Sequence, residues 1–154
     1  MHLAAWANPS DCERDPQAAA RVNVAAGDWL AKLAAESGVP FVLASTDLVF
    51  DGRAAPYAPN AAPTPLHRYG HQKVEAEARV CARHPGAVVA RLPLLYDTPI
   101  GDTSCFASEL LARWSRGEAT PLFEDEFRTP ALARDVAAAL WDLLDHAGGT
   151  VHLG

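Results

Sequence analysis

Residues 40–44 read PFVLA, a run without a single polar side chain. A strand of this composition is typical of the middle of a parallel sheet, where both faces are buried. Before it, apolar residues recur at helical spacing from a start at Asp15-Pro16 to a stop at Gly38. After it, a helix over about residues 68–83 leads into a second apolar strand at 87–92. This alternation predicts an α/β fold with a doubly wound parallel sheet and flanking helices.

The remaining segments extend the same pattern. Residues 1–6 are typical of the end of a strand, and residues 50–65 contain four prolines and are predicted to form a loop. We expect a third helix with an apolar stripe, a fourth helix capped by Thr129-Pro130, and a last strand from Thr150; the stripe is Phe106, Leu110, Leu111 and Trp114. The chain has no G-x-G-x-x-G turn, which normally follows the first strand of a nucleotide-binding sheet. We therefore expect a partial Rossmann-like sheet that is missing its first strands.

The composition excludes several classes of protein. The chain has 154 residues, 49% hydrophobic and 21% charged, which is ordinary for a single globular domain. Its net charge of −6 argues against a nucleic-acid partner, since phosphate binding needs a basic surface. No apolar run is long enough to span a membrane, and no secretion signal is recognisable, so we expect a cytoplasmic protein. Three scattered cysteines are expected to be reduced thiols, and His67 and His71 lack the further ligands of a metal site, so no metal is predicted.

Three groups of polar residues are candidates for chemistry. Tyr69 and Lys73 are four residues apart on a predicted helix and therefore share a face, where the ammonium is expected to lower the pKa of the phenol. Residues 45–47 (Ser-Thr-Asp) directly follow the buried strand, at the sheet edge where α/β folds bind ligands. Asn23 interrupts an apolar stretch of helix. Each group also has a purely structural alternative. Tyr69 would be a surface tyrosine packed on the lysine stem, residues 45–47 a turn that bonds its own backbone, and Asn23 an amide that bonds a neighbouring carbonyl.

The order of these motifs resembles that of the extended short-chain dehydrogenases/reductases. HLAA (2–5), Asn23, STDLVFDG (45–52), YGHQK (69–73) and ARLPLLY (90–96) follow one another as they do in that superfamily. Within it the chain is most similar to dTDP-4-dehydrorhamnose reductases and their sugar-nucleotide-binding relatives. The resemblance covers about residues 2–153. It implies that residues 1–154 are one domain, comprising the C-terminal part of an NAD(P)-binding Rossmann domain and the start of a substrate-binding region.

The resemblance also implies a catalytic role for four residues. Tyr69 would be the general acid that protonates the keto oxygen of a nucleotide-activated sugar as a reduced nicotinamide delivers hydride. Lys73 would lower the pKa of that tyrosine and bind the nicotinamide ribose, and Thr46 would bond the same keto oxygen. Asn23 would support the lysine through water. The implied activity is NAD(P)H-dependent reduction, with NADP or NAD as cofactor, and whether the 154 residues act alone is left open.

Further residues are implied in binding. The implied cofactor-binding residues are Leu3, Ala4, Ala5, Ser45, Tyr69, Lys73, Leu92 and Pro93. The implied substrate-binding residues are Thr46, Asp47 and Arg128, the last in the weakest match to the family. Two departures concern the sugar: Leu48 replaces the usual tyrosine after S-T-D, and residues 91–94 read RLPL where rhamnose-type reductases often have RTSW. Reductase chemistry is therefore expected more firmly than a rhamnose substrate.

Two alternatives stay open on the same scaffold. One is an NAD-dependent sugar-nucleotide epimerase, and the other is a non-catalytic subunit such as the regulatory subunit of methionine adenosyltransferase. By analogy with the superfamily, a homodimer through the helices that carry Asn23 and Tyr69 is also expected.

Overall fold

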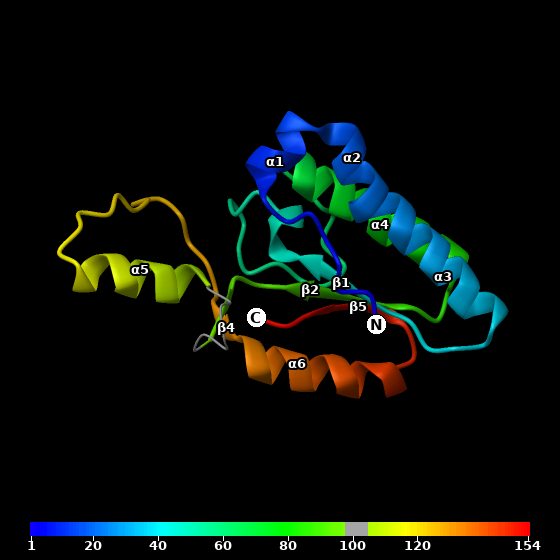
Figure 1. The fold of residues 1–154 in the computed structure, drawn as a ribbon. Helices are drawn as coiled ribbons and strands as arrows, with labels where there is room; N and C mark the ends of the chain where they lie inside the picture. The colour runs from blue at the N-terminus through cyan, green and yellow to red at the C-terminus, as the bar shows by residue number, and fades with distance from the viewer. Residues whose placement is uncertain (98–104) are drawn as a thin grey trace.

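The sheet of the computed structural model is parallel and lies between two helical layers (Figure 1). The structure describes residues 1–97 and 105–154. The strands β1 (Val42–Thr46), β2 (Val88–Leu92) and β5 (Gly149–His152) pair in the order β1-β2-β5, all parallel. The N-terminal segment joins the free side of β1, where His2 bridges Leu43 in parallel. The predicted α/β fold with a Rossmann-like parallel sheet is confirmed.

One face of this sheet is covered by the helices that precede and follow β1. These are α1 (Pro9–Arg14), α2 (Pro16–Ala20), the π-helical turn η1 (Arg21–Ala25), α3 (Ala26–Glu36) and α4 (Arg68–Arg83). The opposite face is covered by α6 (Ala133–Asp142), which continues into the 3-10 turn η3 (Leu143–Asp145) (Figure 1). Alternate residues of β1 therefore belong to different cores: Leu43 packs with Ala76 and Val80 of α4, and Val42 packs with α6. Burial on both faces explains why the strand sequence contains no polar alternation.

The remaining elements lie beyond the carboxyl ends of the strands. The 3-10 turn η2 (Asp47–Val49) follows β1 directly. Two short strands, β3 (Leu95–Tyr96) and β4 (Ala131–Leu132), form a separate parallel pair. Helix α5 (Phe106–Ser115) projects away from the sheet in Figure 1. Across the described residues, no helix is long and apolar enough to cross a membrane.

Several predicted boundaries were wrong. The predicted start at Asp15-Pro16 and stop at Gly38 are confirmed, since Asp15 caps α2 and Gly38 follows the end of α3, but the π turn between α2 and α3 and the helix α1 were not predicted. The first strand lies two residues further along than predicted, so it includes Ser45 and Thr46. Thr129-Pro130 does not cap α6, because residues 131–132 first pair with β3 and the helix begins at Ala133. No residue of α5 is buried, so its apolar stripe does not face a core.

Gly70, the third residue of α4, sits where no side chain fits. A Cβ built there overlaps the carbonyl oxygen of Leu48 and lies 2.8 Å from Cβ of Pro65. The missing side chain lets the start of α4 lie against the turn that follows β1. Glycine next to Tyr69 therefore sets how closely the helix approaches the strand end.

We expect Gly70→Ala to lower the free energy of unfolding by about 1–3 kcal/mol, because the new methyl group forces backbone apart. Urea unfolding followed by circular dichroism measures the change. Gly86→Ala is the matched control, since its new Cβ would approach the His84 ring only to 3.4 Å. Equal stability of the two variants would contradict this account.

Candidate active site

Tyr69 and Lys73 lie on successive turns of α4 and face the end of β1. Both are buried, with 6% and 2% of their surface exposed. The Tyr69 ring packs with Cys12 and Ala19, and the Thr46 side chain lies near enough to the phenol to affect its pKa. Tyr69 is thus not a surface residue, and Thr46 and Tyr69 share one site as their roles in the resemblance require.

The pKa of Tyr69 moves in the opposite direction from the one we expected. Burial raises it to about 12, with smaller contributions from Cys12 and Asp47, and only the Thr46 side chain lowers it. The expected lowering by Lys73 was wrong for this structure, because spacing along a helix does not reveal how much water the phenol loses. The consequence is a phenol that keeps its proton throughout the neutral range.

The Lys73 ammonium is bonded to the backbone of β1. Its Nζ donates to the carbonyl oxygen of Ala44 at 2.7 Å. Burial lowers the pKa of Lys73 to about 8, and Glu77 opposes this shift. His2 lies on the N-terminal segment that pairs with β1. Its own burial, and then the charge of Lys73, lower the pKa of His2. Lys73 is therefore a buried ammonium group whose pKa lies close to neutral pH.

Thr46 and Asp47 have structural contacts besides any role in chemistry. The Thr46 hydroxyl accepts from the backbone N–H of Leu48 at 3.2 Å and donates to Oδ1 of Asp47 at 3.2 Å. Asp47 binds Arg128 through both carboxylate oxygens, at 3.1 Å for each hydrogen bond. Arg128 also donates to Glu126 at 2.9 Å. Asp47 and Arg128, the two charged residues implied in substrate binding, thus form an ion pair with each other.

Asn23 binds the N-terminal segment and α4 through direct hydrogen bonds. Its Oδ1 accepts from the backbone N–H of Trp6 at 2.7 Å, and its Nδ2 donates to the Trp6 carbonyl at 3.1 Å and to Oε1 of Gln72 at 2.9 Å. The π turn points this side chain inward, and only 1% of its surface is exposed. Asn23 therefore fixes the position of the segment ending at Trp6, and no contact with Lys73 is described.

The implied cofactor-binding residues are divided between surface and interior. Leu3, Ala4 and Ala5 are exposed beside β1, and Pro93 is buried just beyond the half-buried Leu92 at the end of β2. Ser45 is not directed to solvent: its hydroxyl donates to Oε1 of Glu77. This contact makes Ser45 part of the interior polar network.

Sequence reasoning missed Glu77 and Arg91, which form the buried ion pair of this region. Nη2 of Arg91 lies 2.7 Å from Oε2 of Glu77, and their side chains are 6% and 9% exposed. Two signals were present: Glu77 follows Lys73 by one helical turn, and Arg91 is a charge inside the apolar strand VVARL.

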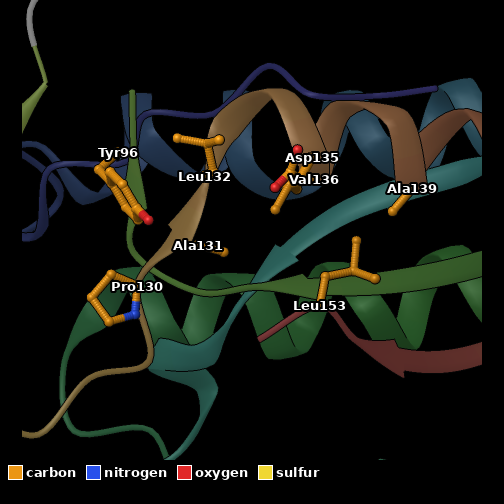
Figure 2. A pocket seen from close by; sticks show the side chains of 8 residues that line it. All are labelled: Tyr96, Pro130, Ala131, Leu132, Asp135, Val136, Ala139 and Leu153. Atoms are coloured by element: carbon orange, nitrogen blue, oxygen red, sulfur yellow. The ribbon is translucent and has the colours of Figure 1, made fainter. Parts of the chain in front are cut away.

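A groove of about 400 Å³ lies elsewhere, between the β3–β4 pair and α6 (Figure 2). It is lined by Tyr96, Pro130, Ala131, Leu132, Asp135, Val136, Ala139 and Leu153. None of the residues predicted for catalysis or binding contributes to it. The groove therefore shares no lining residue with the cluster of Thr46, Tyr69 and Lys73.

Comparison with known families agrees with this geometry. The family model described as the RmlD substrate binding domain matches residues 1–154. The chain belongs to this family. The resemblance to dTDP-4-dehydrorhamnose reductases and their relatives is thereby confirmed.

Four known proteins show what this chain is similar to. The probable low-salt glycan biosynthesis reductase Agl14 of Haloferax volcanii is 34% identical over 99% of this chain and 52% of its own length. The methionine adenosyltransferase 2 subunit beta of Danio rerio is 36% identical over 96% of this chain and 45% of its own. A crystal structure of a dTDP-4-dehydrorhamnose reductase from Clostridium acetobutylicum matches with a TM-score of 0.88 and 29% identity, over 97% of this chain and 53% of that one. MoeE5 in complex with UDP-glucose and NAD matches with a TM-score of 0.83 and 25% identity, over 99% and 55%. This RmlD-family chain thus spans about half the length of the proteins it matches.

We expect the Lys73 side chain to titrate near pH 8, because burial destabilises its charged form. The chain has two lysines, so Lys32→Arg leaves Lys73 as the only one, and its Cε carbon can be followed by ¹³C NMR across pH 6–11. Lys32 is half exposed and pairs with Glu36, a contact that arginine retains. A midpoint above pH 10 would contradict the buried environment.

Proposed function

We propose that this chain carries the proton-donating half of an NAD(P)H-dependent reductase that acts on a keto group of a nucleotide-activated sugar. The observation that supports this best is the buried Tyr69 phenol beside the Thr46 side chain, with the Lys73 ammonium one helical turn away. The relatives named as reductases point to the same chemistry.

The three side chains have separate tasks in this proposal. Thr46 donates a hydrogen bond to the keto oxygen and fixes its position next to Tyr69. The phenol then gives its proton to that oxygen as the carbon receives hydride, so the ketone becomes an alcohol and Tyr69 a phenolate. The Lys73 cation stabilises the phenolate, which solvent reprotonates. A reduced nicotinamide, when bound, supplies the hydride.

The residues present fit one end of such a cofactor. An ammonium has three N–H donors, and the hydrogen bond described for Lys73 goes to Ala44, so a ribose hydroxyl could be bound by the others. Leu3, Ala4 and Ala5 offer an exposed backbone beside β1, and Leu92 and Pro93 end the neighbouring strand. We propose NADP or NAD as the cofactor, as in the NAD complex of MoeE5.

The nucleotide-sugar side of the proposal rests on Asp47 and Arg128. Arg128 is 20% exposed and held by Asp47 and Glu126, so a diphosphate would have to replace one of these carboxylates. Leu48 stands where rhamnose-type reductases usually have tyrosine. The substrate class we propose is therefore a nucleotide-linked keto sugar, with dTDP-4-dehydrorhamnose as one member.

A non-catalytic role is the second candidate, because several relatives are methionine adenosyltransferase 2 beta subunits, which are 40–43% identical over 62% of this chain. The beta-subunit relatives show that this scaffold also occurs in a subunit of another enzyme. A homodimer through the helical segments that carry Asn23 and Tyr69, η1 and α4, remains a prediction.

We expect Tyr69→Phe to reduce turnover by about 10²–10⁴-fold, because it removes the only proposed proton donor. The assay follows NADPH oxidation with a nucleotide-linked 4-keto sugar, using protein that contains residues 1–154. Tyr96→Phe is the control, since Tyr96 is 42% exposed on β3. Wild-type turnover in the Tyr69 variant would refute the general-acid role, and absence of turnover in the wild type would favour the non-catalytic candidate.

We also expect residues 1–154 on their own to bind NADPH weakly. A glycine-rich turn at a helix N-terminus provides most of the pyrophosphate contacts in Rossmann folds, and the sequence contains no such turn. Isothermal titration calorimetry of the 154-residue chain tests this. Tight binding would show that other residues hold the pyrophosphate.

A further inference from the structure

Glu77 is the centre of a buried polar network that the proposed chemistry does not yet use. Its Oε1 accepts from the Ser45 hydroxyl and from Nε of Arg91 at 3.1 Å, and its Oε2 accepts from Nη2 of Arg91 at 2.7 Å. Glu77 and Arg91 are 7% and 6% exposed. Both carboxylate oxygens of Glu77 thus have partners inside a buried network.

The network lies one helical turn beyond Lys73, on the same face of α4. Lys73 bonds the carbonyl of Ala44, and Glu77 bonds the side chain of the next residue, Ser45. Thr46, the following residue, lies beside Tyr69. Three consecutive residues of β1 therefore face three consecutive turns of α4, and Glu77 provides one of the two hydrogen bonds that hold them.

Arg91 extends the network to the rest of the site. It lies opposite Ser45 in the β1–β2 pair, stacks over the Phe50 ring at 5.0 Å, and donates to the carbonyl of Pro59 at 3.2 Å. Its Nη1 also lies 3.4 Å from Nε2 of His152 on β5. A buried ion pair is weak evidence for stability, because apolar residues can fill the same space at no greater cost. We therefore look for a role of the Glu77–Arg91 ion pair other than stabilising the fold.

We propose that Glu77 is a positioning residue for the reduction: through Ser45 it fixes the strand end that presents Thr46, and its carboxylate supports the Lys73 ammonium. This inference rests on the proposed function for the roles of Thr46 and Lys73. The part that concerns the state of Lys73 can be measured without any turnover.

The charged groups around Lys73 and Glu77 determine how a substitution of Glu77 changes the pKa of Lys73. Lys73 is faced by His2 from the N-terminal segment and by Glu77 from its own helix. Glu77 is faced by Arg91 of β2, His152 of β5 and Cys81 one turn further along α4. Since Glu77 opposes the lowering of the Lys73 pKa by burial, its loss leaves the lysine less protonated at neutral pH.

The test compares Glu77→Gln with Glu75→Gln in the Lys32→Arg background. Glu75 is on the same helix but is half exposed and pairs with Arg79. The Cε signal of Lys73 is titrated by ¹³C NMR. We expect a lower midpoint in Glu77→Gln and a wild-type midpoint in Glu75→Gln; unchanged midpoints in both variants overturn the electrostatic part of the proposal.

Two further variants allow for a folding defect. Glu77→Gln leaves Arg91 buried without its partner, so Glu77→Gln/Arg91→Gln is prepared as an uncharged pair, and it too is expected to lower the Lys73 midpoint. Ser45→Ala keeps the ion pair and removes only the bond to β1. Where turnover is measurable, we expect Ser45→Ala to lower kcat while the basic limb of its pH profile stays in place.

Kinetic measurements distinguish a failure of this proposal from a failure of the proposed function on which it rests. We expect Glu77→Gln to lower kcat and to move the basic limb of the pH profile to lower pH, whereas Glu75→Gln behaves as wild type. Wild-type kinetics in folded Glu77→Gln would overturn the positioning role. If the wild type itself shows no turnover, the proposed function fails, and the lysine titration still decides the electrostatic part.

Discussion

The structure depends on the contact between one strand and one helix. Ala44 and Ser45 of β1 are bonded to Lys73 and Glu77 of α4, and Thr46 lies beside Tyr69. A strand advances about 3.3 Å per residue and a helix about 5.4 Å per turn, so these contacts tie the two elements at different heights. Any displacement of α4 along β1 would break both hydrogen bonds inside a buried region. The position of the phenol relative to the strand-end hydroxyl is thereby fixed by the fold.

This contact requires polar groups to be buried, and the sequence supplies a bonding partner for each of them. Lysine, glutamate and arginine are rarely buried unless paired, and here each has a partner: Lys73 bonds a backbone carbonyl, and Glu77 and Arg91 bond each other. No buried side-chain nitrogen or oxygen in the described part of the chain lacks a hydrogen bond. Gly70 allows the close approach, since any larger residue would push α4 away from the turn after β1. The same burial that positions the residues also shifts the pKa values of Tyr69 and Lys73 in opposite directions.

Sequence reasoning recovered the elements better than it recovered their contacts. The bounds of α4 agree with the predicted residues 68–83, because His84-Pro85-Gly86 ends the helix. The helix-face argument paired Tyr69 with Lys73, and the family resemblance added Thr46 to them. By contrast, periodicity says which face a residue occupies and not what it meets there, so the partners of Asn23, Ser45 and Arg128 could not be predicted. The pKa of Tyr69 was wrong for a related reason, since desolvation is a property of the packed interior.

The π turn at Arg21–Ala25 has a consequence for comparing this chain with others. A turn of this kind accommodates one residue more than an α-helical turn does, and it often marks a functional position. It is the extra residue that directs the Asn23 amide toward Trp6 and Gln72 while α3 keeps its own apolar face on the sheet. An alignment with homologues that have an ordinary helix here therefore needs a one-residue gap within residues 21–25. Without that gap, every position of α3 would be equated with a residue about 100° away around the helix axis.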